Sequence, residues 1–293
     1  MQCYFRTAAL CVTIGLAGYF IGGSAIEAQQ PVPTLDRMLT PGSVFADSRT
    51  PISSLPFTID RCGSYFLTGC LTGVAGENGI TIDADDVTLD LNGFGIEGVP
   101  GSLDGVHVTS GPRRNVLICD GSVRNWGDDG IDAGGGAAAS HEIRILGVRA
   151  MGNASNGIRA GSETDIVSCS SNGNGADGIS VGGGCTVEGN ECRDNGRHGI
   201  VAENDCWILE NFVDDHCDGS GIRTDSVATN IEHNAIGDCA IGIEVGGSGN
   251  LVIRNAVNDS NCDGTHYMIA AGNVVGPIVG TASGSGPWAN FSY

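Results

Sequence analysis

Lysine is absent from the 293-residue sequence, so all 14 basic residues are arginine, and 34 acidic residues bring the formal net charge to −20 at pH 7. Binding to phosphate backbones requires clustered positive charge, so this balance argues against nucleic acid as a partner. Aromatic residues make up only 5% of the chain, so a core must be built from Ile, Val, Leu and Ala. Proline is also scarce, with 9 residues, and without a Gly-X-Y period this excludes a collagen helix.

Glycine, in contrast, is abundant, with 48 residues. A glycine inside a helix costs about 1 kcal/mol relative to alanine, which argues against a bundle of long helices. Hydrophobic residues reach 41% of the chain, which is enough to form a folded core. The acidic surface that remains suits solubility, cation binding or basic partners.

The first 28 residues have the layout of a secretory signal. An uncharged apolar stretch at residues 8–21 follows Arg6, and small residues such as Ala25 and Ala28 come after it. The stretch is short and Gly-rich for a stable membrane span. We therefore expect a cleaved signal peptide at residues 1–28, with an uncleaved anchor as the alternative. The mature chain would be secreted or periplasmic and would have no transmembrane span. Residues 29–50 are predicted to be a linker.

An internal repeat dominates the rest of the sequence. Glycine followed by Ile or Val recurs in steps of 21 to 27 residues, at Ile80, Val106, Ile131, Ile158, Ile179, Ile200, Ile222 and Ile243. Each position begins a short alternating run such as GISV, which is typical of a strand with one buried face. A second motif, Ile or Val followed three residues later by Asn, recurs later in the unit, ending at Asn190, Asn211, Asn234 and Asn255.

Units this short cannot bury an apolar face alone, but stacked units can. Each strand then pairs in parallel with the equivalent strand of the next unit. Connections between parallel strands are nearly always right-handed. The leucine-rich repeat signature is missing. The sequence therefore predicts an all-β fold, a right-handed parallel β-helix of about 8–10 coils with roughly 21–27 residues each. We place it at residues 51–280, with an N-terminal cap at 51–76. The C-terminal tail, 281–293, would dock back on the stack or serve as a sorting or assembly segment.

The alternation also predicts which side chains point inward. One inward column holds the Ile and Val residues that follow the glycines. A second lies two residues further on and comprises Ile82, Val108, Ala133, Ala160, Val181, Ala202, Thr224 and Val245. The residues between the columns should point outward in one line: Thr81, His107, Asp132, Arg159, Ser180, Val201, Arg223 and Glu244.

On these motifs the chain resembles the pectin-lyase-like superfamily of right-handed parallel β-helices, over about residues 55–275. It is especially similar to secreted bacterial β-helix repeat proteins that open with RTPISSLPFTI, continue with DDVTLDLNGF and end in PWANF. Those segments lie here at residues 49–59, 85–94 and 287–291. The resemblance implies the fold but assigns no activity.

One stretch of the outward line carries reactive side chains. His107, Asp132 and Arg159 should lie on consecutive coils about 4.8 Å apart, beside the residues that precede the glycines. The candidate site comprises Asp104, His107, Asp128, Asp129, Asp132 and Arg159. Trp126 would offer a stacking face for a sugar. No cofactor is required, but Asp128, Asp129 and Asp132 could hold Ca²⁺.

This patch suits two kinds of chemistry. Paired carboxylates can hydrolyse glycosides, and GDDGID at residues 127–132 looks like the Gly-Asp-Asp element of polygalacturonases. The resemblance to pectate lyases would instead make Arg159 the base of a Ca²⁺-assisted β-elimination. The sequence departs from both patterns: the coil after Asp129 lacks a His-Gly element, and the chain has no lysine. Asp or Asn before Gly is also what a tight turn requires.

Two functions therefore remain open on the sequence. The first is an exported solenoid that presents a polar surface to acidic or neutral polysaccharides, cations or cell-envelope components. The alternative is a polysaccharide lyase or glycoside hydrolase acting at the six-residue patch. A fold resemblance alone does not decide between them.

The cysteines allow both disulfides and buried thiols. Twelve are present, of which ten follow residue 28. Cys185 and Cys206 have the same offset in adjacent units and should stack, as should Cys217 and Cys239. Cys62 and Cys70 bracket the turn of an expected first hairpin.

Overall fold

The computed structural model describes residues 47–109, 111, 113–134, 141–258, 262, 264–280 and 286–292. The expected signal peptide and nearly all of the linker lie outside these residues. The chain divides into two units, Met1–Ser48 and Arg49–Tyr293, and every described strand belongs to the second. Among the described residues there is no helix, and so none long and apolar enough to cross a membrane.

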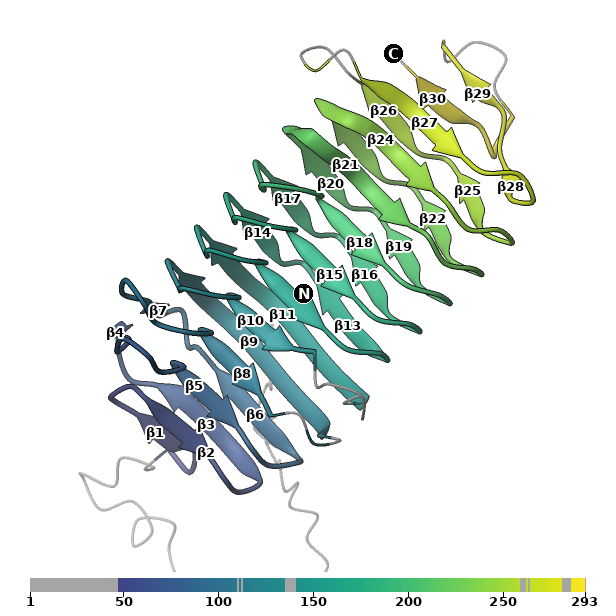
Figure 1. Ribbon diagram of the computed structural model, residues 1–293. Helices are drawn as coiled ribbons and strands as arrows, with labels where there is room; N and C mark the ends of the chain where they lie inside the picture. The colour runs from purple at the N-terminus through teal and green to yellow at the C-terminus, as the bar shows by residue number, and fades with distance from the viewer. Residues whose placement is uncertain are drawn as a thin grey trace, which may run out of the picture. The chain divides into compact units, whose positions relative to one another are not determined.

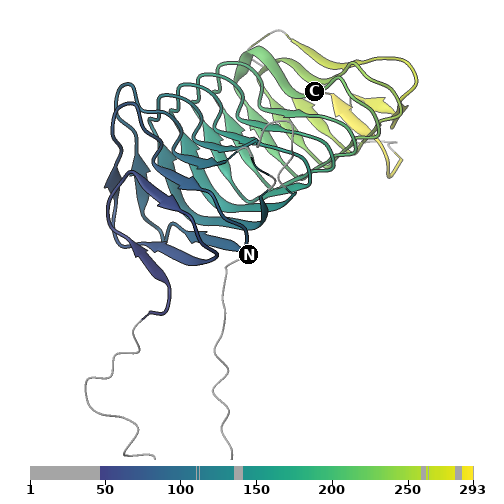
Figure 2. The same cartoon turned by 60° about the horizontal axis from the view of Figure 1, so that its bottom comes forward.

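The second unit is a stack of coils joined by two parallel sheets (Figures 1 and 2). The smaller, called sheet B, contains ten strands in the described residues. They are β2 Phe57–Ile59, β5 Ile80–Ile82, β8 Val106–Val108, β10 Ile131–Ala133, β12 Ile158–Ala160, β15 Ile179–Val181, β18 Ile200–Ala202, β21 His216–Thr224, β24 Cys239–Val245 and β27 Thr265–Ile269. Each strand pairs in parallel with its equivalent in the next coil.

The larger, called sheet A, contains twenty described strands and forms the other two sides of the coils. They are β1 Thr50–Ile52, β3 Gly63–Leu67, β4 Leu71–Thr72, β6 Val87–Asp90, β7 Gly95–Glu97, β9 Arg114–Arg124, β11 His141–Met151, β13 Thr164–Val167, β14 Ser170–Asn172, β16 Thr186–Glu188, β17 Glu191–Arg193, β19 Trp207–Leu209, β20 Phe212–Asp214, β22 Asn230–Glu232, β23 Ala235–Gly237, β25 Leu251–Ile253, β26 Ala256–Asn258, β28 Val274–Val275, β29 Ile278–Val279 and β30 Asn290–Ser292. The predicted all-β, right-handed parallel β-helix is thus confirmed.

Both predicted inward columns are confirmed. The side chains from Ile80 to Ile243 in the first column have no exposed area, and every member of the second column is buried. The predicted outward line is confirmed as well, since register pairs Thr81 with His107 and continues without a slip to Glu244. Period-two alternation fixed this result, because a one-residue shift would turn each apolar side chain toward solvent.

The recurrent asparagines form a hydrogen-bonded ladder at the bend between the two faces of sheet A. The Oδ1 atom of Asn211 accepts the backbone N–H of Asn190 at 3.0 Å, and its Nδ2 donates to the carbonyl of Val187 at 2.8 Å and to Oδ1 of Asn234 at 3.0 Å. The asparagine at the bend thus satisfies polar groups in the coils on both sides of its own. Buried amides need such partners, which explains why this position is repeatedly Asn.

The C-terminal segment completes the ladder. Asn290 accepts the backbone N–H of Asn255 at 3.0 Å, although 35 residues separate them. Strand β30, which contains Asn290, pairs with both β26 and β29. The PWANF segment therefore docks on the last coils, one of the two roles expected for the tail.

Two expectations about the cysteines are wrong. Cys217 lies five residues before Ile222 but Cys239 only four before Ile243, so the two do not share an offset, and register places Cys239 opposite His216. Cys217 instead forms a disulfide with Cys262 at a Cα–Cα distance of 5.4 Å. There is also no first hairpin around Cys62 and Cys70. Strand β2 belongs to sheet B and β3 to sheet A, and both cysteines are exposed free thiols.

The thiols of Cys185 and Cys206, by contrast, lie buried in adjacent coils as stacking predicted. The backbone N–H of Trp207 donates to the carbonyl of Cys185 at 2.8 Å, which places the two cysteines at equivalent points. Both are free, so the buried-thiol alternative holds for this pair.

Candidate functional site

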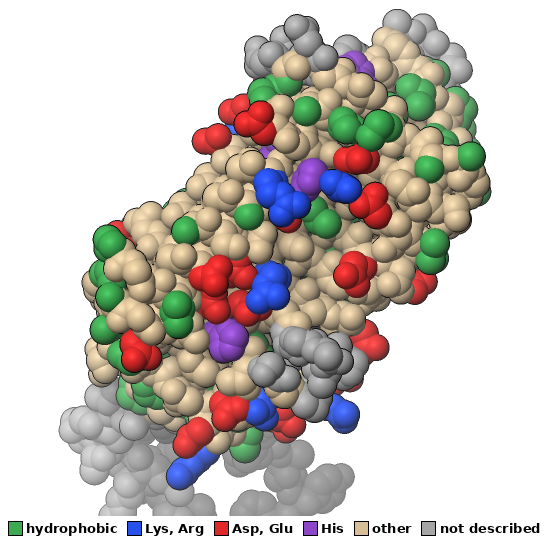
Figure 3. Space-filling model, viewed as in Figure 1, with side chains coloured by type: hydrophobic (Ala, Val, Ile, Leu, Met, Phe, Trp, Pro, Cys, Tyr) green, Lys and Arg blue, Asp and Glu red, His purple; other side chains and the backbone are tan. Residues whose placement is uncertain are grey.

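The outer face of sheet B brings the predicted site residues together. His107 on β8 pairs in register with Asp132 on β10, which pairs with Arg159 on β12. Asp104, Asp128 and Asp129 lie in the turns that lead into β8 and β10. Figure 3 shows carboxylates gathered against arginine and histidine side chains on this face. Within this cluster Asp104, Asp129 and Asp132 are buried, whereas Asp128 is exposed.

The turn residues before the glycines form a second ladder, which runs along the edge of sheet B. Oδ1 of Asp104 accepts the backbone N–H of Asp129 at 3.0 Å, and Oδ1 of Asp129 accepts that of Asn156 at 2.8 Å. The same contact continues from Asn156 to Asp177 and from Asp177 to His198. The preference for Asp or Asn at this position is therefore structural, as turn chemistry alone would suggest.

Each buried carboxylate of the cluster uses its second oxygen for a cation. Oδ2 of Asp104 lies 3.0 Å from Nδ1 of His107, and Oδ2 of Asp129 accepts Nε of Arg159 at 2.8 Å. Asp132 binds the backbone N–H of Gly134 through Oδ1 and Nη2 of Arg159 through Oδ2, at 2.8 and 2.6 Å. Burial of a charge is costly without such partners. In each of these carboxylates, Oδ1 is therefore held by a backbone N–H group, and Oδ2 is held by a cationic side chain of the cluster.

His107 lies between two carboxylates. Its Nδ1 is 3.0 Å from Oδ2 of Asp104 and 3.3 Å from Oδ2 of Asp132. Hydrogen bonds from Asp104 and then Asp132 raise the pKa of His107 to about 9, although burial opposes this. The imidazole is therefore charged at neutral pH. In turn, His107 and Gly134 overcome the cost of burial and lower the pKa of Asp132.

Arg159 spans two carboxylates and cannot easily lose its proton. Burial disfavours its charge, but the hydrogen bond to Asp129 and the nearby charge of Asp132 outweigh this and raise the pKa of the guanidinium. A base for β-elimination requires a lowered pKa. The geometry therefore makes Arg159 a binding and positioning cation, which disfavours the base role that the pectate-lyase resemblance implied.

Asp128 differs from the other acids of the cluster because it is exposed. Partial burial, followed by the charges of Asp104 and Asp129, raises the pKa of its carboxyl group. Three buried carboxylates face only two cations, His107 and Arg159, and Asp128 adds further negative charge. A proton or a hydroxyl donor is therefore favoured beside Asp128.

A hollow of about 280 Å³ that was not predicted adjoins Arg159. Small residues form most of its lining, among them Gly134, Gly161, Ser162 and Ser180. A Cβ atom added at Gly134 would lie 2.9 Å from Nη1 of Arg159, so the guanidinium lies directly over this glycine. Glycines three positions after Ile131, Ile158 and Ile179 are visible in the sequence, but only stacking of the coils makes them one depression.

The expected sugar-stacking role of Trp126 is wrong, because its side chain is only 1% exposed. The indole fills space inside the first coils, where a Cβ atom at Gly73 or Gly79 would lie within 2.6 Å of it. Its Nε1 donates to the carbonyl of Ile96 at 3.4 Å. Glycines in neighbouring coils created room for one large ring in the core.

Two sets of cluster residues could hold a cation. The ligand atoms of Asp104, Asp128 and Asp129 lie within 4.8 Å of one another, as do those of Asp104, His107 and Asp132. The predicted calcium ligands Asp128, Asp129 and Asp132 thus divide between the sets, which share Asp104. Carboxylate oxygens suit Ca²⁺, but Arg159 already occupies Asp129 and Asp132.

A family model described as periplasmic copper-binding protein (NosD) matches residues 78–267, which is more than half of the chain. No curated protein matches the sequence. Among solved structures, pectate lyase Pel9A shares 10% identity at a TM-score of 0.57, covering 75% of this chain and 68% of that one. The A-modules of Azotobacter vinelandii mannuronan C-5 epimerases AlgE6 and AlgE4 share 14% and 15% identity at TM-scores of 0.44 and 0.45. Their alignments cover 83% and 75% of this chain and 77% and 85% of theirs. The pectate lyase likeness supports the fold alone.

Of the two sets in this cluster, the one that contains a nitrogen ligand is Asp104, His107 and Asp132. In the described structure this set is better suited to hold a proton on His107 than a copper ion. Cu²⁺ accepts imidazole and carboxylate ligands, which Asp104, His107 and Asp132 would provide. Nδ1 of His107 is already held between both carboxylates, and its pKa of about 9 means that a metal must displace a tightly held proton. Arg159 also brings a positive charge to Asp132.

Proposed function

We propose that this chain, which belongs to the NosD family, is a periplasmic β-helix that binds an oligosaccharide on the outer face of sheet B. The binding surface comprises the six-residue cluster and the hollow beside Arg159. The family description supports the periplasmic location. A cleaved signal peptide at residues 1–28 is the route that we propose for export.

One observation carries the binding proposal. The three buried acids of the cluster are anchored by backbone N–H groups, while donors remain available toward the open face. Among the hydrogen bonds of the described residues, none uses Nη1 of Arg159 or Nε2 of His107. Sugar hydroxyls are both donors and acceptors, so they can bond to these atoms and to Asp128 together. Ligand sites are typically hollows with a few fixed polar groups of this kind.

Calorimetric titration of the mature chain with neutral and acidic oligosaccharides tests the proposal. Ser180→Phe fills the hollow from an outward position and should abolish binding. Asp128→Asn removes an exposed charge and should weaken it about tenfold, the scale of a hydrogen bond to a charged group. Glu188→Gln, an exposed acid on sheet A, should bind as the parent does. Equal binding by Ser180→Phe and the parent would refute the placement.

Hydrolysis is a second candidate function, favoured by the raised pKa of Asp128 beside two other carboxylates. A carboxyl group that keeps its proton can act as the general acid, next to an ionised partner. The oxygens of Asp104, Asp128 and Asp129 lie within 4.8 Å of one another, close to the separation of about 5–5.5 Å in retaining glycosidases. This spacing disfavours the inverting mechanism, which needs about 6.5–9.5 Å.

An activity screen on polysaccharides, with Ca²⁺ and with chelator, separates the candidates. Reducing ends that disappear in Asp128→Asn would establish hydrolysis at this site. Unsaturated products that require Ca²⁺ would establish a lyase and overturn the assignment of Arg159 as a binding cation. If the chain retains a glycan and forms neither product, binding is the function that remains.

A further inference from the structure

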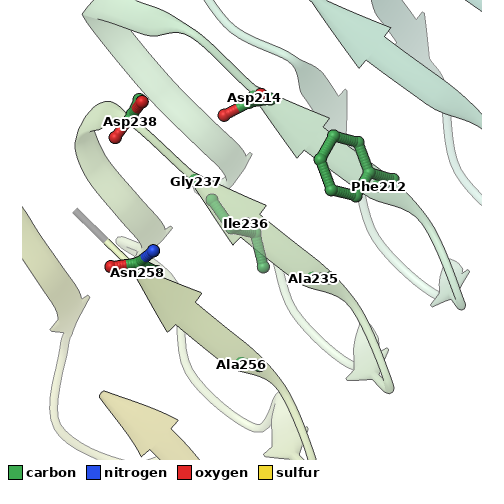
Figure 4. Close-up of a pocket in the computed structure, with 8 residues that line it drawn as sticks. All are labelled: Phe212, Asp214, Ala235, Ile236, Gly237, Asp238, Ala256 and Asn258. Carbon is green, nitrogen blue, oxygen red and sulfur yellow. The ribbon is translucent and has the colours of Figure 1, made fainter. Parts of the chain in front are cut away.

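Sheet A carries a second hollow, on the face formed by β20, β23 and β26. The outward residues at one register position are Phe212, Ala235, Ala256 and Phe291 in successive strands. Two alanines thus replace large side chains between two phenylalanines. Three strand spacings separate the aromatic residues, or about 14 Å. On the Phe212 side of this row, a hollow of about 350 Å³ is lined by Phe212, Ala235 and Ala256 but not by Phe291 (Figure 4).

The polar groups of this hollow lie along one side. Asp214, Gly237 and Asn258 lie two positions after Phe212, Ala235 and Ala256 in their strands. Asp238 follows Gly237. A Cβ atom at Gly237 would lie 2.6 Å from Oδ1 of Asp214, so the carboxylate rests over the glycine. Figure 4 shows Asp214, Asp238 and Asn258 on one side, and Phe212 with the two alanines toward the other. The hollow is therefore apolar along one edge and acidic along the opposite edge.

Among the described residues, one cation lies against the Asp214 side of this acidic edge. Arg193 is the basic side chain beside it, and its Nη1 lies 3.9 Å from Oδ2 of Asp214. Its Nε is committed to Glu191 at 2.7 Å, and its guanidinium stacks over Phe212 at 4.6 Å. Burial, and after it the charge of Asp238, raise the pKa of Asp214, although Arg193 opposes the shift. An anionic ligand would be repelled here, and a cationic one attracted.

We propose that the sheet A hollow binds one residue of an amino sugar that carries a free ammonium group. A pyranose ring presents an apolar C–H face that suits Phe212, Ala235 and Ala256. Its hydroxyls suit Asn258, and the ammonium group suits the carboxylates of Asp214 and Asp238. The volume is within the usual range of small-ligand sites. This site is separate from the oligosaccharide surface on sheet B and does not depend on it.

Titration calorimetry of the mature chain with glucosamine oligomers tests the proposal directly. We expect saturable binding that weakens as salt is raised from low to physiological concentration, because the contact between charges is screened. Asp214→Asn should weaken binding about tenfold or more. Ala235→Phe fills the hollow from an exposed position and should abolish binding while leaving the melting temperature unchanged.

Two controls distinguish this site from sheet B and from general charge attraction. Glu188→Gln removes an exposed acid outside the hollow, and Ser180→Phe blocks the sheet B hollow, so both should bind glucosamine oligomers as the parent does. The N-acetylated oligomers and galacturonate oligomers should bind at least tenfold more weakly. Equal binding of the N-acetylated oligomers would overturn the ammonium assignment. Equal binding by Ala235→Phe, or no binding of glucosamine oligomers, would overturn the site.

Discussion

Asp104 and Asp129 show how a residue can serve the fold and the site at once. In each, Oδ1 accepts a backbone N–H of the next coil, and Oδ2 faces a cation, His107 or Arg159. An asparagine could fill the first role, as Asn156 does in the next coil. Only the aspartates add charge. The same turn position is therefore structural along the stack and also electrostatic where an aspartate meets a cation, as at these two coils and at Asp177, which lies 3.7 Å from Nε of Arg197.

The pKa of His107 gives a prediction for pH dependence. Its folded value of about 9 lies above the ordinary 6.5, so its charged form stabilises the native state. That contribution is fully present below about pH 6.5 and is lost as the pH rises through 9. We expect the parent to lose stability over this interval relative to His107→Gln, measured by guanidinium chloride unfolding at several pH values. An NMR titration of His107 near pH 6.5 would contradict this.

At the scale of the element, the strands of sheet B are mostly three residues long, too short for independent stability. Their order comes from the column of inward Ile and Val residues and from parallel neighbours on both sides. Each buried Ile contributes about 1.5–3 kcal/mol. A single inward position should therefore affect the stack far more than the outward position next to it.

Ile179→Asp compared with Ser180→Asp tests this difference on one strand. The first substitution removes a fully buried apolar side chain and places a carboxylate in the interior of the stack. We expect it to lower the free energy of unfolding by at least about 4 kcal/mol. The second places the same group outward and should change stability by less than about 1 kcal/mol. Chemical denaturation of both variants measures the effect, and similar midpoints would refute the inward register.

The asparagine ladder gives a second prediction at this scale. Asn211→Ala leaves buried groups of Asn190, Asn234 and Val187 without their partners. We expect a loss of about 2–5 kcal/mol in the free energy of unfolding, because each unsatisfied buried group costs about 1–3 kcal/mol. Asn204→Ala, at an exposed position, is the matched control and should be nearly neutral. Thermal unfolding of the pair would show whether the ladder is a structural requirement.

At the scale of the whole solenoid, the open problem of a stack is its ends, where strand edges lack a neighbour. The C-terminal segment meets this need by adding β30 beside β26 and Asn290 to the ladder. Arg254 reinforces the contact, since its guanidinium stacks on Trp288 at 4.3 Å and its Nε donates to the carbonyl of Pro287.

A chain that ends at Gly280 should therefore have a frayed last coil. We expect its melting temperature to fall and amide protons of β25 and β26 to exchange faster, while those of β10 and β12 keep their protection. Local loss is expected because each coil contacts only its neighbours. Hydrogen exchange followed by mass spectrometry measures this. Uniform loss of protection along the stack would instead indicate that the segment is needed for folding as a whole.

The sequence by itself determined the right-handed parallel β-helix, both inward columns and the outward line through His107, Asp132 and Arg159. A period of two within strands and a repeat of 21 to 27 residues between them specify these features position by position. Local pattern could not show that Trp126 turns inward, because the space for it comes from glycines in other coils. It also could not show the disulfide of Cys217 with Cys262, which joins residues 45 positions apart in the sequence. Only the tertiary structure decided these points and the two hollows, since each arises from side chains of several coils that meet only when the stack is formed.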